Sequence, residues 1–107
     1  MIKIGEVSTF AMPLADKEQA TKVLEEAAEV YAEWQAYDRG EQVDPFNLQC
    51  ECADLIQATC NLLAGIGVND FTGFIAECKI RNEYRGRMYE ETKKPFVREI
   101  KEQLTLC

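Results

Sequence analysis

Two pairs of acidic residues have a spacing that suits the binding of a metal ion. Glu26 and Glu29 lie in the segment LEEAAEV, and Glu51 and Asp54 lie in CECADLI. Each pair is spaced i, i+3, so in a helix both of its carboxylates lie on one face. Four carboxylates that converge without counter-charges repel one another, and a hard divalent cation relieves that repulsion. The pattern therefore predicts a site for Mg2+, with Mn2+ as a substitute, in which these four residues are the metal ligands.

The two acidic pairs differ in how strongly they indicate a site. An EE-x-x-E run on a helix is more often a solvated face, so the first pair alone favours no function. The second pair is harder to dismiss, because Asp54 is the only charged residue between Glu51 and Ala64. Both pairs border apolar positions, which places them on or beside the faces that turn toward a helical core.

A basic segment, CKIRNEYRGR, follows in a chain whose formal net charge is −7. It offers charge-assisted hydrogen-bond donors that suit phosphate groups. A basic last turn that compensates the helix macrodipole is an equally good explanation of this segment alone. Together with the acidic pairs, the segment favours a phosphate-binding role. The candidate substrate-binding residues are Lys79, Arg81, Asn82 and Arg85.

Helices are needed to position these residues, and the chain carries the signals for four of them. Asp16 is a good N-cap with Gln19 at the capping-box position, and Gly40 is a good C-terminal stop. Asp44 followed by Pro45 starts a second helix. The predicted helices cover residues 17–39, 45–64, 70–86 and 96–104. Residues 1–14 are predicted to be extended and to pack along the helices or across a subunit boundary.

The predicted fold class is all-α, because no segment shows the sustained alternation of a strand. The expected architecture is a four- to five-helix bundle that oligomerisation completes, since 107 residues bury only a modest core. We expect one domain, 1–107, with its core in residues 17–87. The N-terminal residues do not resemble a signal peptide, and no segment has the length of a membrane span.

The composition excludes several classes of function. The negative charge argues against a nucleic-acid polymer as partner, because such a partner needs a basic surface. The chain has no histidine, which excludes Ser-His and Cys-His nucleophiles. The odd count of five cysteines, without a C-x-x-C pair, favours reduced thiols in a cytoplasmic protein. A zinc site at Cys50 and Cys52 is a weak alternative.

The acidic and basic motifs together resemble those of the MazG-like all-α NTP pyrophosphatases. Glu25, Glu26 and Glu29 followed by Glu51 and Asp54 match the EExxE…ExxD signature, and the segment around Asn82 is similar to the phosphate-binding third helix of that family. The resemblance covers about residues 17–87.

This resemblance implies an Mg2+-dependent hydrolase that converts a nucleoside triphosphate to the monophosphate and pyrophosphate. It implies that the four carboxylates hold the metal and that the basic segment contacts the triphosphate. It also implies a homodimer or homotetramer. The alternatives are a phosphoribosyl-ATP pyrophosphohydrolase, a dUTPase or dCTPase of the same superfamily, and a non-catalytic helical module that binds nucleotide or metal.

Overall fold

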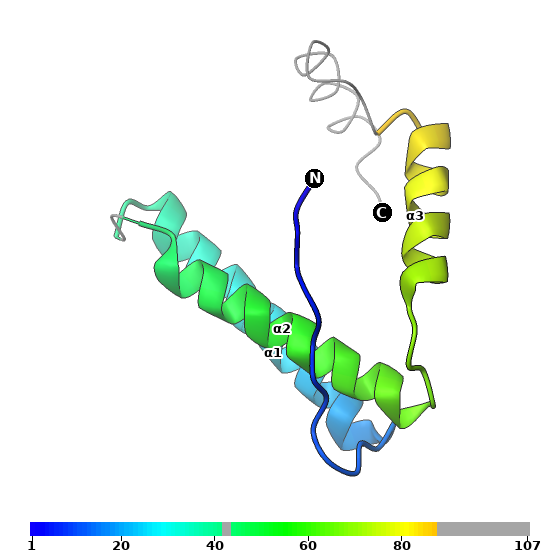
Figure 1. Cartoon of the computed structure of the whole chain (residues 1–107). Helices are drawn as coiled ribbons and strands as arrows, with labels where there is room; N and C mark the ends of the chain where they lie inside the picture. Colours follow the sequence, from blue (N-terminus) through cyan, green and yellow to red (C-terminus); the bar gives the residue numbers. More distant parts are fainter. Residues whose placement is uncertain (42–43, 88–107) are drawn as a thin grey trace. The chain divides into compact units, whose positions relative to one another are not determined.

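The computed structural model describes residues 1–41 and 44–87, and in this part of the chain the regular secondary structure is α-helix, without strands (Figure 1). The helices are α1 (Lys17–Asp38), α2 (Phe46–Gly65) and α3 (Thr72–Tyr84). The predicted all-α class is therefore confirmed, whereas the helix predicted at 96–104 lies outside the described residues. The chain divides into two compact units, Met1–Asn69 with α1 and α2, and a second that begins at Asp70 and contains α3.

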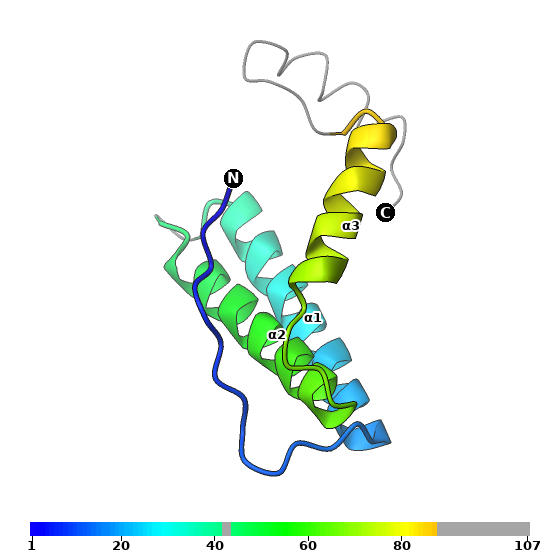
Figure 2. The same cartoon turned by 45° about the vertical axis from the view of Figure 1, so that its right-hand side comes forward.

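Helices α1 and α2 form an antiparallel hairpin and lie side by side in both views of the ribbon (Figures 1 and 2). The side-chain amide of Gln19 donates to the carbonyl oxygen of Ala58 at 3.0 Å. Seven residues further along α1, Glu26 lies across from Glu51, which precedes Ala58 by seven residues. Equal steps in opposite directions along the two helices fix the register that brings the two acidic pairs together.

The helix ends follow the signals in the sequence, with one difference. The Asp16 carboxylate caps α1 by accepting from the backbone N–H of Gln19 at 2.8 Å. The Gln19 side chain reaches across to α2 instead of completing a capping box, because the buried carbonyl of Ala58 offers it an acceptor. At Gly40 and Gly67 the backbone turns left-handed, and the bonds Glu41 N–H to Ala36 and Val68 N–H to Leu63 close a Schellman motif after each helix.

The N-terminal arm, residues 1–14, has no helix or strand and lies along α2, as predicted (Figure 2). The Gln57 side chain donates to the carbonyl oxygen of Ser8 at 2.8 Å, and the Phe10 N–H donates to Asn61 Oδ1 at 3.1 Å. The backbone around Leu14 also approaches Gly65 so closely that a side chain at Gly65 would collide with it. These contacts tie the arm to the hairpin before α1 begins.

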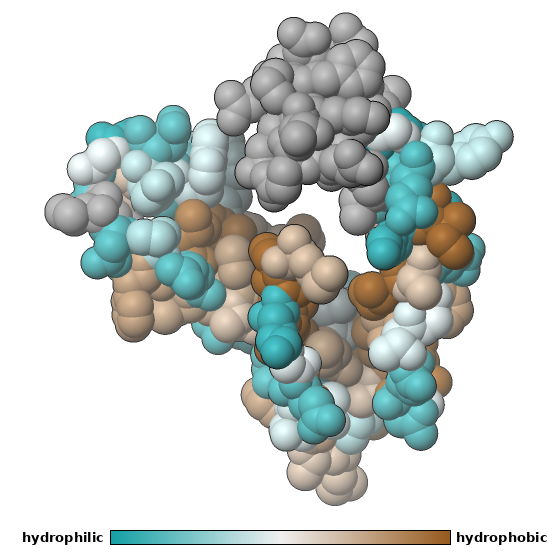
Figure 3. All heavy atoms as spheres, turned by 45° about the horizontal axis from the view of Figure 1, so that its top comes forward, coloured by the Kyte–Doolittle hydropathy of each residue, from teal (hydrophilic) through white to brown (hydrophobic). Residues whose placement is uncertain are grey.

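The described residues enclose little apolar surface. Ala58 is the one buried hydrophobic residue among them, and many large hydrophobic side chains are open to solvent (Figure 3). On α1, for example, Leu24 is 69% and Tyr31 is 59% exposed. Within the same residues, no helix combines the length and the apolar character needed to cross a bilayer.

Candidate metal centre

Three of the four predicted metal ligands meet between α1 and α2. One carboxylate oxygen from each of Glu26, Glu51 and Asp54 lies within 4.8 Å of the others. Glu26 comes from the middle of α1, and the other two come from one face of α2. It is the only group of three or more potential metal ligands among the described residues, and it contains no cysteine. The antiparallel register of α1 and α2 therefore places carboxylates from both acidic pairs next to one another.

Two oxygens of this cluster are buried without a hydrogen-bond partner in the part of the chain that the structure describes. They are Glu26 Oε2 and Glu51 Oε2, one on each helix. Glu26 is only 6% exposed. A buried carboxylate oxygen without a partner is costly, because it has lost its water and gained no donor. Carboxylate oxygens of this kind are donors that a hard cation prefers.

Glu29, the fourth predicted ligand, belongs to the same acidic cluster through its neighbours. The Glu51 carboxylate, and then Glu26, raise the pKa of Glu29 to about 7, because a proton on Glu29 allows it to hydrogen-bond with both. The Glu29 side chain is exposed, so repulsion between like charges contributes more to this shift than burial does. All four predicted carboxylates are thus neighbours, although Glu29 lies outside the group of three.

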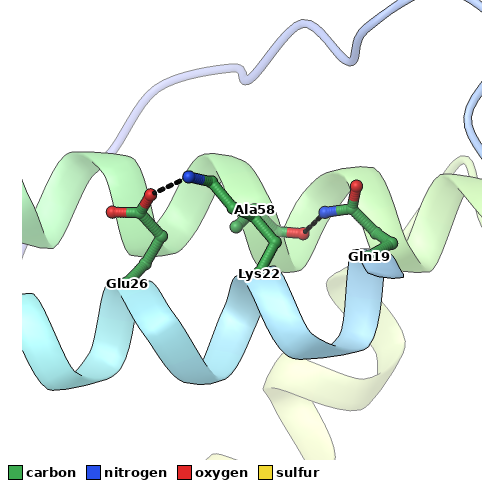
Figure 4. A network of polar contacts seen from close by, with 4 residues as sticks. All are labelled: Gln19, Lys22, Glu26 and Ala58. Atoms are coloured by element: carbon green, nitrogen blue, oxygen red, sulfur yellow. Dashed lines mark hydrogen bonds and ion pairs between the residues drawn. The ribbon is translucent and has the colours of Figure 1, made fainter. Parts of the chain in front are cut away.

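Lys22 supplies a positive charge to the cluster, and the sequence patterns did not single it out. Its ammonium nitrogen lies 2.9 Å from Glu26 Oε1 (Figure 4). The hydrogen bond between them raises the pKa of Lys22 and lowers that of Glu26. The signal was its i, i+4 spacing to Glu26, which is a common surface pair. Lys22 occupies only Oε1, so the unpartnered Oε2 remains available to a cation.

No protein-family model matches the chain, and neither a curated protein nor a solved structure matches it significantly.

The predicted phosphate-binding residues all lie on α3 or at its end, in the second unit. Lys79, Arg81 and Arg85 are exposed. Lys79 lies 3.9 Å from Glu83, one helical turn ahead. The Asn82 amide is engaged within the unit, since it donates to Cys78 Sγ and accepts from the Arg87 guanidinium, each at 3.4 Å. The role of these residues in binding phosphate stays a prediction.

The stability of the metal-free protein should fall as the pH rises from 5 to 8. Folded Glu29 keeps its proton up to about pH 7, whereas its ordinary pKa is 4.5. Between these values the folded state binds more protons than the unfolded state, so the free energy of unfolding decreases with rising pH. Thermal unfolding in EDTA at several pH values measures this slope. Glu29→Gln should flatten the dependence of stability on pH. An unchanged slope in that variant would contradict the assignment of the slope to Glu29.

Proposed function

We propose that this protein is an Mg2+-dependent hydrolase that cleaves nucleoside triphosphates to monophosphate and pyrophosphate, as its resemblance to the MazG-like enzymes implies. The observation that carries the proposal is the meeting of Glu26, Glu51 and Asp54, with a buried, unpartnered oxygen on each helix. A chance acidic surface would leave its carboxylates in water. Here the two helices bring them together and withdraw two oxygens from solvent.

The residues present fit a hard divalent cation better than any other metal. Glu26, Glu51 and Asp54 would hold it, with Glu29 beside them, and all of the donors are carboxylate oxygens. When bound, Mg2+ would lower the pKa of a coordinated water and neutralise charge on the phosphates. The net charge of −7 is compatible with a phosphate substrate once such a cation is present.

In the proposed reaction, the bond between the α- and β-phosphates is hydrolysed. Water attacks phosphorus, the bond to the bridging oxygen between these two phosphates breaks, and pyrophosphate leaves. The proton of the attacking water passes to a carboxylate, either Glu25 or one of the ligands. Glu25 lies beside Glu26 in the sequence and lines the neighbouring groove. The resemblance assigns the triphosphate to the exposed basic side chains of α3 and to Asn82. No histidine or serine nucleophile is needed for this route.

The proposal includes a homo-oligomer, either a dimer or a tetramer, that completes the predicted four- to five-helix bundle. It is supported by the sparse core and by the exposed hydrophobic residues of α1. A cytoplasmic location is proposed from the cysteines, because Cys50, Cys52, Cys60 and Cys78 are all free thiols.

The direct test is the release of pyrophosphate from each common NTP and dNTP, and from phosphoribosyl-ATP, with Mg2+ and with EDTA. We expect release that depends on Mg2+ and that matches the monophosphate formed. The ranking of substrates separates a general pyrophosphatase from the dUTPase, dCTPase and phosphoribosyl-ATP alternatives. A folded protein that releases pyrophosphate from none of them would be a non-catalytic module, and the proposal would be wrong.

A further inference from the structure

A groove of about 970 Å³ opens between the N-terminal arm and the first half of α1. Its size is within the range of small-molecule binding sites. Phe10 lines it from the arm, Lys22 and Glu25 from α1, and Asn61 from α2. Lys22 is the residue that pairs with Glu26 (Figure 4), so the groove borders the carboxylate cluster.

Asn61 contributes its amide side chain to the lining of this groove. The residue is only 4% exposed, and its Oδ1 accepts from the Phe10 N–H at 3.1 Å and from Gln57 Nε2 at 3.0 Å. Because a backbone N–H can only donate, the bond to Phe10 fixes which end of the amide is the oxygen. The Nδ2 amino group makes no hydrogen bond to any residue that the structure describes. The Nδ2 atom is not one of the buried, unpartnered oxygens and nitrogens, so it keeps contact with water, which an acceptor on a ligand can replace.

The distance from Asn61 to the carboxylates suits the nucleoside part of a nucleotide. Asn61 follows Asp54 by seven residues, which is two helical turns or about 10 Å along α2. A nucleotide with its phosphates at the carboxylates can therefore extend its sugar and base along the groove toward Asn61. The Phe10 ring, which is 66% exposed, offers an aromatic face at the same place.

We propose that this groove binds the nucleoside portion of the substrate, with Asn61 Nδ2 donating to an acceptor atom of the base and Phe10 stacking on its face. This inference rests on the proposed function. Asn61 acts only as a donor here, since both of its acceptor positions are taken by Phe10 and Gln57. Stacking on Phe10 adds affinity without choosing among bases, so the hydrogen bond carries the selectivity.

The experiment compares two ligands on the full-length protein with Mg2+. One is the non-hydrolysable α,β-imido analogue of the best substrate, and the other is inorganic tripolyphosphate, which has no nucleoside. Calorimetry gives the affinity for each ligand. The ratio of the affinity for the imido nucleotide to the affinity for tripolyphosphate measures the contribution of the nucleoside. Asn61→Asp keeps an oxygen for the Phe10 N–H and for Gln57 but loses the amino group. We expect it to lower the ratio at least about tenfold.

Phe10→Ala provides a second measurement that does not depend on folding with a buried charge, because Phe10 is largely exposed. It should lower the ratio at least about fivefold through lost stacking. Thr59→Val is the matched control, since it removes only the hydroxyl bond to the Leu55 carbonyl on the same helix, and Thr59 does not line the groove. It should keep the wild-type ratio.

The outcomes separate this inference from the proposed function. If Asn61→Asp and Phe10→Ala both keep the wild-type ratio while Mg2+-dependent turnover persists, the groove does not bind the nucleoside and the proposed function stands. If the wild-type protein binds neither the imido nucleotide nor tripolyphosphate, the proposed function fails, and this inference fails with it.

Discussion

Glu51→Gln and Asp54→Asn should each lower the rate of pyrophosphate release at least about a hundredfold, because each removes a negatively charged ligand from the proposed metal site, which has few others. The folded protein should persist in both variants. In EDTA their thermal stability should equal or exceed that of the wild type, because one of the clustered charges has been removed. Loss of turnover without loss of stability distinguishes a catalytic site from a structural one.

Metal binding gives the same pair of variants a second readout. Mg2+ at a hundredfold excess over its dissociation constant should stabilise the wild-type protein by about 2.7 kcal/mol. The variants should gain much less at the same concentration. Asp38→Asn is the matched control, since Asp38 is an exposed acid on the last turn of α1, outside the cluster. Equal stabilisation of all these proteins by Mg2+, with turnover unaffected, would show that the cluster does not hold the metal.

Much of this site could be predicted because it depends on local sequence signals. The i, i+3 acids, the Asp16 cap and the Gly40 stop determine where the helices begin and end and which faces carry the charges. The antiparallel packing of two helices joined by a short loop then brings the acids together. The helical class, which is confirmed, and the meeting of Glu26, Glu51 and Asp54 both depend on interactions within one helix or between consecutive ones.

The parts that could not be predicted depend on tertiary contacts. The pattern around Gln19 indicates a capping box, but only the position of α2 reveals that the Ala58 carbonyl competes for its amide. The role of Asn61 is also ambiguous in the sequence. Its spacing from Asp54 suits a residue that contacts a ligand and equally one that hydrogen-bonds to a neighbouring segment of the chain. The structure shows that its oxygen holds the arm at Phe10. The sequence of the arm carries no signal for that partner, which lies 51 residues away.

Leu24→Glu combined with Tyr31→Glu should convert the proposed oligomer to a monomer of 12.2 kDa. These residues are seven apart on α1, so they lie on one face, and both are more than half exposed in the single chain. A stable interface must bury about 1,200 Å² or more, and its centre excludes charged residues. Two buried glutamates on each chain would also repel their counterparts across a twofold axis. Light scattering coupled to size exclusion measures the mass directly.

Ile66→Glu is the control for the added charge. Ile66 is 66% exposed and caps the C-terminal end of α2, on the other helix, so this variant should keep the wild-type mass. A wild-type monomer at micromolar concentration would refute the proposed oligomer, and an unchanged mass in the double variant would place its interface elsewhere. If the monomer forms, we also expect a lower melting temperature, because Ala58 alone is buried among the hydrophobic residues described. A hairpin with so small a core would gain stability from apolar area covered by the proposed second subunit.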